Sequence, residues 1–526
     1  MPDQIGKITV PDSAASGTFP IVPERTALVL ALAPAQAATA FQLVRRCDAR
    51  VPLTAEDREW AGRCWQLKGG QRYRGVKARA GEFLRTAQGR LEIGPQIANL
   101  PHGHVTLERE TPSMSDKPSS LLRPHTQVLT RGFDPSLSVG SARPAVFRSS
   151  TYVFSSPEAA ERAFDLMAGR AQPTPGEQPD LVYSRFNHPN AEILEDQIVP
   201  LETGAHAALV FNSGMAAIVT ALLTFCRPGQ SIVYTVPIYG GTQHLIQDFL
   251  EQFGITGIPV MAGRTEEMDR AILCARECAV VLIETPANPT IIMTDIRHAA
   301  ECASRLPVRP LVMVDNTLMG PAFQHPLILG ADLSIYSATK YLSGFSDMIG
   351  GVAIASDPAL IRKMRSKRSL FGNILQPDEC WMLDTRLPTV TLRMNRASKN
   401  AERIASRLAN HPKIASVLYP TLFTDCEQVR ITQAQCDFPG GMLSIDLRGG
   451  KPAAFEFLRN LQIARNAVSL GGVETLVCHP KTTTHSGFTE EEFEQAGVTD
   501  GLVRISIGIE DWRDLLADFE QALEAV

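Results

Sequence analysis

The segment Ser334–Gly351 reads SIYSATKYLSGFSDMIGG and places one lysine, Lys340, between small hydroxyl residues directly after an apolar run. Glycine, serine and aspartate follow the lysine within a few residues. A lysine after a strand is most often a solvated residue in a turn. Whether Lys340 has another role depends on which residues the rest of the chain places beside it.

The composition is that of a globular protein with small-molecule partners. The chain has 526 residues, of which 44% are hydrophobic and 20% charged, so it can form two or three domains with their own cores. A formal net charge of -5 and the lack of a long basic run give no electrostatic feature for nucleic acid or an anionic membrane. The sequence also lacks an apolar run of about 18 residues, which a membrane-spanning helix would need.

The ten cysteines are scattered and form no C-x-x-C pair. Cys274 and Cys278 have no second pair of ligands nearby, so the sequence indicates neither a zinc site nor a disulfide framework. We therefore expect reduced thiols in a cytoplasmic protein that binds no metal.

Residues 1–113 differ from the rest because they lack the later alternation of apolar runs and helix-length segments. A polar leader typical of a protein start follows Met114, so we expect residues 1–113 to be a poorly ordered extension or a start-site artefact. The segment RTALVLALAPAQA at 25–37 is similar to the apolar part of an export signal. However, Asp3 and Glu24 precede it in place of a compact basic start, which disfavours export.

Short apolar runs recur from about Ala207 onward, and polar or glycine-rich residues follow each of them. Uninterrupted runs of this length are typical of strands that are buried on both faces of a mainly parallel sheet. Helix-length segments with apolar residues at helical spacing lie between the runs, so the sequence predicts an α/β fold. The polar clusters after the runs are Asn212–Met215, Pro237–Gly241, Pro286–Pro289, Asp315–Thr317 and Ser337–Lys340.

These clusters predict one shared site, because ligands of open α/β sheets bind beyond the carboxyl ends of the strands. A lysine used covalently forms a Schiff base with a carbonyl compound. Pyridoxal phosphate further needs a phosphate cup, an acid for its ring nitrogen and a group that covers the ring. Asp315, which ends a buried run, can face the ring nitrogen, and Tyr239 can stack on the ring.

The phosphate cup is predicted where a helix begins. Ser213, Gly214 and Met215 open a helix-length segment, so their backbone N–H groups and the positive end of the helix dipole can hold an anion. Ser337 and Thr339 add hydroxyl donors beside the lysine.

From about Leu129 to the C terminus, the chain resembles the Cys/Met-metabolism (transsulfuration) family of pyridoxal-phosphate enzymes. This group contains cystathionine γ-synthase, cystathionine γ-lyase and methionine γ-lyase. The resemblance rests on eleven ordered motifs, which are RGFDP, SSTYVF, YSR, NSGMAAI, YGGT, ETPANPT, VDNT, GADLSIYSATKY, VSLGGVETL, THSGFT and LVRISIGIEDWRDLLADFEQAL.

The resemblance implies a type I pyridoxal-phosphate transferase fold. An N-terminal arm would span residues 114–190, a large cofactor-binding domain residues 191–375, and a smaller C-terminal α/β domain residues 376–526. Such enzymes are usually homotetramers built from two tight dimers.

The resemblance also implies a role for each matched residue. Lys340 would be the Schiff-base lysine and proton carrier, Asp315 the partner of the ring nitrogen, and Tyr239 the stacking phenol. The remaining roles are phosphate binding by Ser213, Gly214, Met215, Ser337 and Thr339, contact with the cofactor hydroxyl by Asn288, completion of the neighbouring subunit's site by Tyr183 and Arg185, and binding of the substrate carboxylate by Ser469 and Arg504.

Some of these residues also fit ordinary structural roles. Arg504, in the alternating segment LVRISIG, could be an outward residue on a strand, and Tyr239 could be a turn aromatic. The chain could also be a silent relative that only binds a ligand. A dinucleotide-dependent oxidoreductase is disfavoured, because no G-x-G-x-x-G opens a helix after a strand.

Two departures from the family bear on specificity. After the lysine, the family usually has glycine, histidine, serine and aspartate, whereas this chain has Phe345 in place of the histidine. Methionine γ-lyases typically carry a cysteine two residues after the stacking tyrosine, where this chain has Gly241. That glycine argues against a dedicated methionine γ-lyase, although the segment CHPKTTTHSGFTEEE is more similar to that branch.

We therefore expect an enzyme of amino-acid metabolism that acts at the γ carbon of a γ-substituted L-amino acid, such as cystathionine, methionine or a homoserine ester. Loss of the γ substituent followed by hydrolysis would release 2-oxobutyrate and ammonia, and we favour this γ-elimination. The alternative is γ-replacement as a cystathionine γ-synthase, which joins O-acyl-L-homoserine to cysteine. The motifs are shared by both reactions, and in both Tyr239 is the expected acid for the leaving group.

Overall fold

The computed structural model describes residues 7–8, 19–20, 122–174, 177 and 180–526. Contacts divide the chain into two units, Met1–Arg109 and Glu110–Val526. In the first unit, β1 (Lys7–Ile8) pairs antiparallel with β2 (Phe19–Pro20). The expectation of a poorly ordered extension over 1–113 otherwise falls on residues outside the described ones.

A seven-stranded sheet lies in the second unit, with the strand order β3-β9-β8-β7-β6-β4-β5. Strand β9 is antiparallel to both of its neighbours, and the other pairings are parallel. The predicted α/β fold with a mainly parallel sheet is therefore confirmed. The strands are β3 (Ala207–Phe211), β4 (Ser231–Val236), β5 (Thr256–Met261), β6 (Cys278–Glu284), β7 (Leu311–Asp315), β8 (Leu333–Ser337) and β9 (Gly351–Ala355).

Helices cover both faces of this sheet, which explains why its strands are apolar without alternation. In β6, Val280 and Leu282 face the core that contains residues of α8 (Gly214–Phe225) and α13 (Pro358–Phe371). The intervening Val281 and Ile283 face the core that contains residues of α10 (Thr265–Cys274) and α11 (Ile296–Ala303). Both sets of side chains are thus removed from water.

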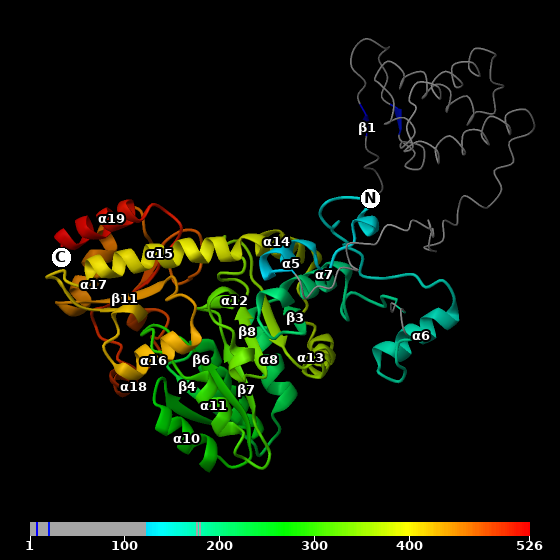
Figure 1. Cartoon of the computed structure of the whole chain (residues 1–526), viewed down its shortest axis with the longest axis horizontal. Coiled ribbons are helices and arrows are strands. Elements are labelled where there is room, and N and C mark those ends of the chain that lie inside the picture. Colours follow the sequence, from blue (N-terminus) through cyan, green and yellow to red (C-terminus); the bar gives the residue numbers. More distant parts are fainter. Residues whose placement is uncertain (1–6, 9–18, 21–121, 175–176, 178–179) are drawn as a thin grey trace, which may run out of the picture. The chain divides into compact units, whose positions relative to one another are not determined.

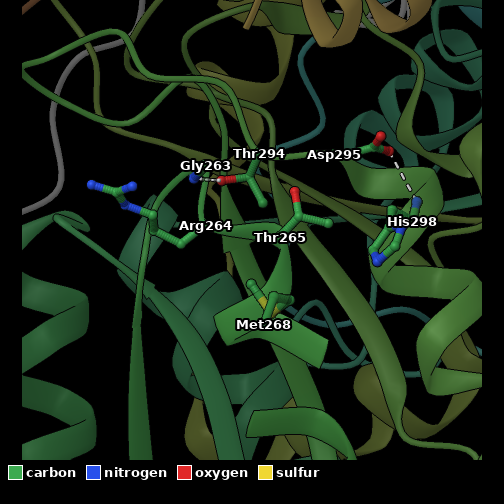
Figure 2. Close-up of a pocket in the computed structure, with 7 residues that line it drawn as sticks. All are labelled: Gly263, Arg264, Thr265, Met268, Thr294, Asp295 and His298. Carbon is green, nitrogen blue, oxygen red and sulfur yellow. Dashed lines mark hydrogen bonds between the residues drawn. The ribbon is translucent and has the colours of Figure 1, made fainter. Parts of the chain in front are cut away.

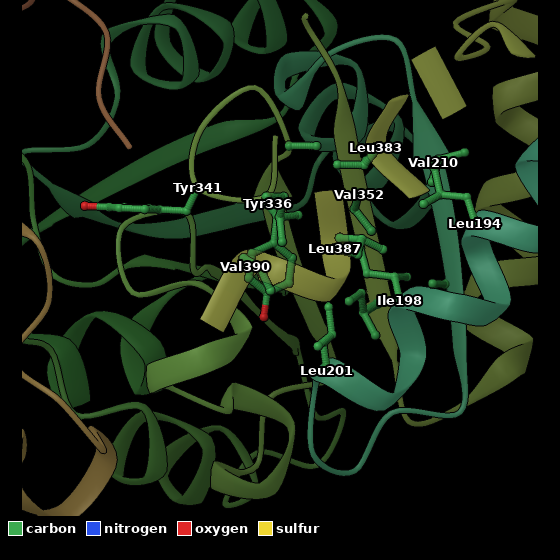
Figure 3. Packing of buried hydrophobic residues seen from close by; sticks show 14 of the residues in the cluster. Leu194, Ile198, Leu201, Val210, Tyr336, Tyr341, Val352, Leu383, Leu387 and Val390 are labelled. Atoms are coloured by element: carbon green, nitrogen blue, oxygen red, sulfur yellow. The ribbon is translucent and has the colours of Figure 1, made fainter. Parts of the chain in front are cut away.

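A further core anchors the segment after β8, which carries Lys340 (Figure 3). Leu194 of α7 (Pro189–Ile198) and Leu383 of α14 (Pro377–Arg386) pack here with Val210 of β3 and Val352 of β9. Tyr341, the residue after Lys340, belongs to the same cluster, as does part of α5 (Pro124–Thr130). The backbone beside the lysine is therefore held by buried apolar contacts.

The C-terminal part forms a five-stranded sheet with its own core, in the order β10-β11-β14-β13-β12. Helix α15 (Val390–Leu408) runs toward this sheet from the region of α14, and α17 (Gly450–Asn460) and α19 (Trp512–Glu524) pack with it (Figure 1). The sheet's strands are β10 (Ile414–Leu418), β11 (Met442–Leu447), β12 (Arg465–Asn466), β13 (Leu476–Cys478) and β14 (Leu502–Ser506).

Two sheets with separate cores confirm the predicted fold class. The arm and domain limits at 114–190, 191–375 and 376–526 stay predictions. Among the described residues, no helix is both long enough and apolar enough to cross a bilayer. The remaining helices are α6 (Pro157–Met167), α9 (Gly240–His244), α12 (Gly320–Phe323), α16 (Cys426–Gln435) and α18 (Glu490–Ala496).

Candidate functional site

The carboxyl ends of neighbouring parallel strands bring the polar clusters to one edge of the sheet. Glu284, the last residue of β6, lies in register with Asp315, the last residue of β7. Asp315 in turn pairs with Ile335 of β8, two residues before Ser337. The sequence predicts that these clusters share an edge, and the strand register places them there.

Lys340 lies in the turn after β8, and its Nζ is 3.1 Å from the Oγ of Ser469. Burial lowers the pKa of the Lys340 amine, and the positive charge of Arg504 lowers it further. A lowered pKa increases the neutral fraction, which is the form that attacks a carbonyl carbon or accepts a proton. The loop of Ser469 can lie this close to the segment of Lys340 because residue 471 is a glycine. A Cβ at Gly471 would lie 2.7 Å from the backbone nitrogen of Tyr341.

Asp315 is buried and held by one neighbour. Its Oδ1 accepts hydrogen bonds from the backbone nitrogen of Thr317 at 3.0 Å and from the Thr317 hydroxyl at 2.5 Å. The same hydroxyl accepts a hydrogen bond from the backbone nitrogen of Ser337 at 2.8 Å. Burial raises the pKa of Asp315, whereas the two bonds from Thr317 lower it. Among the described residues, none donates a hydrogen bond to Oδ2, which leaves this oxygen for a ligand.

Helix α8 begins beside Ser337. The hydroxyl of Ser213 caps the helix by accepting a hydrogen bond from Ala216 N at 3.0 Å, and Gly214 and Met215 are its first two residues. Their N–H groups have no acceptor within the helix, so they suit an anion. A Cβ at Gly214 would lie 2.9 Å from the Cβ of Ser337, so the close approach requires glycine.

Thr339 is less available than predicted. Its Oγ1 accepts a hydrogen bond from the backbone nitrogen of Gly350 at 3.1 Å and lies 3.3 Å from the carbonyl oxygen of the same residue. The hydroxyl therefore already has backbone partners, and phosphate binding by Thr339 stays a prediction.

Tyr239 stands at the start of α9 with its side chain about half exposed. Its backbone nitrogen donates a hydrogen bond to the Oε2 of Glu284 at 2.8 Å. A Cβ at Gly241 would lie only 2.7 Å from Cε1 of the tyrosine ring and 3.2 Å from the sulfur of Met215. The ring therefore packs against Gly241 and stays about half exposed.

Arg504 of β14 is only 2% exposed, so the alternative of an outward strand residue is wrong. Its Nη1 donates to the side-chain oxygen of Asn288 at 3.2 Å, and its Nη2 donates to the carbonyl oxygens of Val468 at 2.8 Å and Ser469 at 3.1 Å. Its Nε is buried and has no hydrogen-bond partner in the described part of the chain. A carboxylate ligand would satisfy this donor and pair with the charge.

Tyr183 and Arg185 are not brought to the site within one chain. Tyr183 pairs with Thr151 in an isolated antiparallel bridge. Arg185 donates from Nη1 to the carbonyl oxygen of Ser369 at 2.6 Å, and its guanidinium lies 4.8 Å from the ring centre of Phe186. Within the described residues, neither contacts Lys340 or its neighbours, and their role in a neighbouring subunit stays a prediction.

Two residues of this edge have no role predicted from the sequence. Glu284 ends the run VVLIE in the same way that Asp315 ends LVMVD, and this parallel is the signal that could have revealed it. Thr317 lies two residues after Asp315, within reach of both the aspartate and the next strand. Both residues occur in matched motifs, ETPANPT and VDNT, but their contacts become visible only in the fold.

A small cavity lined by residues within 263–298 is separate from the candidate site (Figure 2). Its volume of about 10 Å³ suits a single water molecule. It contains none of the candidate residues, and its lining is formed by Gly263, Arg264, Thr265, Met268, Thr294, Asp295 and His298.

The donor set around Lys340 fits pyridoxal phosphate. The amine has a lowered pKa, the start of α8 offers unpaired N–H groups to a phosphate, and Oδ2 of Asp315 can pair with a ring nitrogen. The buried Nε of Arg504 additionally lacks an acceptor, which an amino-acid carboxylate would provide.

Comparisons with known proteins agree with this chemistry. The family model described as Cys/Met metabolism PLP-dependent enzyme matches residues 125–524. The L-methionine gamma-lyase of Pseudomonas putida is 36% identical over 407 residues, which are 76% of this chain and 97% of that protein. The cystathionine gamma-synthase of Mycobacterium bovis is 35% identical over 400 residues, which are 76% of this chain and 96% of that protein.

A solved structure shows the same fold. The crystal structure of cystathione gamma lyase (CalE6) from Micromonospora echinospora has a TM-score of 0.69 and 32% sequence identity, covering 77% of this chain and all of that one. With the family model, the relatives and the site in agreement, the chain belongs to the Cys/Met metabolism family of pyridoxal-phosphate-dependent enzymes.

Proposed function

We propose that this enzyme catalyses γ-elimination on a γ-substituted L-amino acid. The observation that carries its amino-acid substrate class is the buried Arg504, whose Nε lacks a partner beside the Lys340–Ser469 pair. A substrate carboxylate bound there would place the α carbon near the lysine amine. The γ position is supported by the relatives that are named γ-lyase or γ-synthase, whereas another relative is named cystathionine beta-lyase.

Each residue then has a defined task. When bound, pyridoxal phosphate supplies the electron sink that stabilises the charge left at the α carbon. Lys340 Nζ accepts the α proton, because burial and Arg504 favour its neutral form. Arg504 and Ser469 orient the substrate carboxylate, and the hydroxyl of Tyr239 donates a proton to the departing γ substituent.

Two groups hold the cofactor side of the site. The N–H groups of Gly214 and Met215, with the Ser337 hydroxyl, would bind the phosphate. Asp315 would keep the ring nitrogen protonated, since its anion is stabilised by Thr317 but has one free oxygen. Asn288 is turned toward Arg504, so it supports the carboxylate site as well as any contact with the cofactor hydroxyl.

Gamma-replacement is the second candidate, and Gly241 favours it. This residue has no side chain where methionine γ-lyases typically carry a cysteine, and the adjacent Tyr239 ring is half exposed. In this reaction a thiol such as cysteine is the second substrate. An O-acyl-L-homoserine would then supply the γ leaving group.

A product assay separates the two reactions. Purified enzyme is offered cystathionine, methionine, homocysteine and O-acyl-L-homoserine, each with and without cysteine, and 2-oxobutyrate and cystathionine are quantified. We expect 2-oxobutyrate from at least one of the sulfur-containing substrates in the absence of cysteine. Cystathionine formed only from O-acyl-L-homoserine and cysteine, with no 2-oxobutyrate, would replace elimination by γ-replacement.

We further propose a homotetramer that consists of two dimers with shared sites. This is supported by Tyr183 and Arg185, which lie away from the candidate site of their own chain although their motif matches the family. A cytoplasmic location belongs to the same proposal, because the cysteines lack the pattern of an exported disulfide protein. The eight cysteines in the described part of the chain are all free thiols.

A further inference from the structure

Two carboxyl groups stand at the ends of adjacent strands, at the sheet edge that carries the candidate site. Glu284 and Asp315 are in register on the adjacent parallel strands β6 and β7, and adjacent strands are about 4.8 Å apart. Their exposed fractions are 2% and 9%, so water screens neither of them. The charge of Asp315 acts on Glu284, and two buried carboxylates that interact in this way cannot both ionise at little cost.

Glu284 also touches the residue that is expected to cover the ring. Its Oε2 accepts the hydrogen bond from the backbone nitrogen of Tyr239 at 2.8 Å. Tyr239 precedes the first residue of α9, so this bond fixes the point at which the helix and the ring begin. Glu284 therefore connects the backbone of the stacking residue to the strand end that neighbours Asp315.

Burial of Glu284 beside Asp315 favours the protonated form of Glu284. Burial, and to a smaller extent the charge of Asp315, raise its pKa to about 8. The backbone groups of Tyr239 and Asn288, and then the charge of Arg504, act in the opposite direction. Burial also raises the pKa of Asp315, but its carboxylate receives two hydrogen bonds from Thr317, one of them from a hydroxyl at 2.5 Å, and these favour the anion on Asp315.

We propose that Glu284 is a positioning residue that fixes Tyr239 over the ring site and, as the protonated member of the carboxyl pair, leaves Asp315 as the single negative charge facing the ring nitrogen. This inference rests on the proposed function for the ring-facing roles of Asp315 and Tyr239. It adds a task for Glu284, which has no direct contact with the reacting atoms.

Three variants separate the two parts of the proposal. Glu284→Gln keeps the shape and an acceptor oxygen for Tyr239 but can never be charged. Glu284→Ala removes the acceptor, and Glu284→Asp withdraws it by one methylene while keeping a carboxyl group. Asp384→Asn is the matched control, because Asp384 is a buried carboxyl group on α14 whose pKa is also raised by burial.

The first measurement is binding of pyridoxal phosphate to apoenzyme, followed by tyrosine and tryptophan fluorescence and by the near-visible absorption of bound cofactor at pH 7. We expect Glu284→Gln and Asp384→Asn to remain within about threefold of the parent dissociation constant. Glu284→Ala should bind about tenfold more weakly, a free-energy change of about 1.4 kcal/mol. If Glu284→Ala gives no folded apoenzyme by circular dichroism, Glu284→Asp takes its place with the same expected direction.

The second measurement is the thermal midpoint of the apoenzymes between pH 5 and pH 9. A buried acid whose pKa is raised on folding stabilises the protein below its unfolded pKa, and this contribution is lost as the pH rises through its folded pKa. The midpoint of Glu284→Gln should therefore be closest to that of the parent at pH 5, exceed it increasingly up to about pH 8, and keep that difference above pH 8.

Several outcomes would overturn the proposal. Glu284→Gln could bind cofactor as weakly as Glu284→Ala, which would mean that a negative charge on Glu284 is required. Glu284→Ala, or Glu284→Asp in its place, could bind as tightly as the parent, which would remove the positioning role. A midpoint difference for Glu284→Gln that does not change with pH would exclude a protonated Glu284 in the folded enzyme. A parent apoenzyme that binds no pyridoxal phosphate would instead refute the proposed function itself.

Discussion

The two carboxylate oxygens of Asp315 have different roles, one structural and one chemical. One carboxylate oxygen is held by Thr317, and the other is free. Asp315→Asn should keep the bonds from Thr317 through its side-chain oxygen, so cofactor binding should persist. It should lose at least about 100-fold in kcat, because a neutral amide cannot keep the ring nitrogen protonated and an unprotonated ring is a poor electron sink.

The kcat loss of Asp315→Asn is checked by steady-state kinetics together with the absorption of bound cofactor. Thr317→Val is the companion variant, since it removes the hydroxyl that joins Asp315 to Ser337 while keeping a similar shape. Equal turnover in Asp315→Asn and parent would remove Asp315 from its proposed role.

Gly241 supports a second prediction at the residue scale. A Cβ at this residue would lie 2.7 Å from the Tyr239 ring, which is closer than real contacts allow, so the flexible ring must move. Gly241→Ala should therefore lower kcat about tenfold or more through displacement of the phenol, with the fold retained. Steady-state kinetics on the preferred substrate measures this effect.

Gly240→Ala is the matched control for Gly241, because its added Cβ would come no closer than 3.4 Å to the backbone oxygen of Thr484. The two variants add the same methyl group at adjacent residues. If both reduce turnover equally, the effect comes from the helix start and not from the tyrosine ring.

At the scale of elements, one helix holds the segment that carries Lys340. Arg393 of α15 is buried and donates from Nη1 to the carbonyl oxygen of Tyr341 at 2.7 Å and from Nη2 to that of Leu342 at 3.1 Å. Gly344 packs directly against the Arg393 side chain, and no other residue fits there, because a Cβ would overlap the guanidinium group. Phe345 lies over the same group, with its ring centre 5.6 Å from the guanidinium carbon of Arg393.

Arg393→Lys should destabilise the fold by about 2 kcal/mol, since an ammonium group cannot bond both carbonyl oxygens in the fork geometry of arginine. Urea unfolding measures the change. Arg396→Lys on the same helix is the control, because Arg396 is exposed and its nearest hydrogen bond, to Glu510 O, is 3.5 Å long. Equal stabilities of the two variants would show that the hydrogen bonds of Arg393 to the carbonyl oxygens of Tyr341 and Leu342 contribute little to the free energy of unfolding.

The strands of the large sheet and the edge that carries the site could be predicted from the sequence. Continuous apolar runs such as VVLIE indicated strands buried on both faces, and the two cores that divide Val280 from Val281 explain why. The polar clusters after the runs predicted the sheet edge, because parallel strands align their carboxyl ends.

Other features of the site could not be predicted from the sequence, since they depend on register and packing between distant segments. The pairing of Glu284 with Asp315 is set by the alignment of β6 and β7. Arg504 lies in an alternating segment whose buried face is decided only when β14 packs beside the loop of Ser469. The hydroxyl of Thr339 bonds to Gly350, eleven residues away, which no local pattern indicates.

At the scale of the whole molecule, the location of Arg185 raises the question of assembly. Its guanidinium is held by Ser369 on α13 and lies over Phe186, away from Lys340 in the described part of its own chain. A buried ion pair supports this segment, because Arg368 donates to the carbonyl oxygen of Phe186 and also to Glu195. Arg185 is thus held outside the candidate site of its own chain, as its predicted role in a neighbouring subunit requires.

The shared-site arrangement predicts complementation between two inactive proteins, Lys340→Ala and Arg185→Ala. In a hybrid dimer with two-fold symmetry of the interface, one site would carry both lesions and the other would carry neither. Random exchange makes half of the dimers hybrids with one intact site of two, so mixing should restore up to about a quarter of parental activity. Subunit exchange is verified by mass spectrometry of dimers with one isotope-labelled partner. Activity that stays at the level of the separate variants, although exchange is complete, would place Arg185 outside any shared site, since every hybrid would then still lack a functional centre.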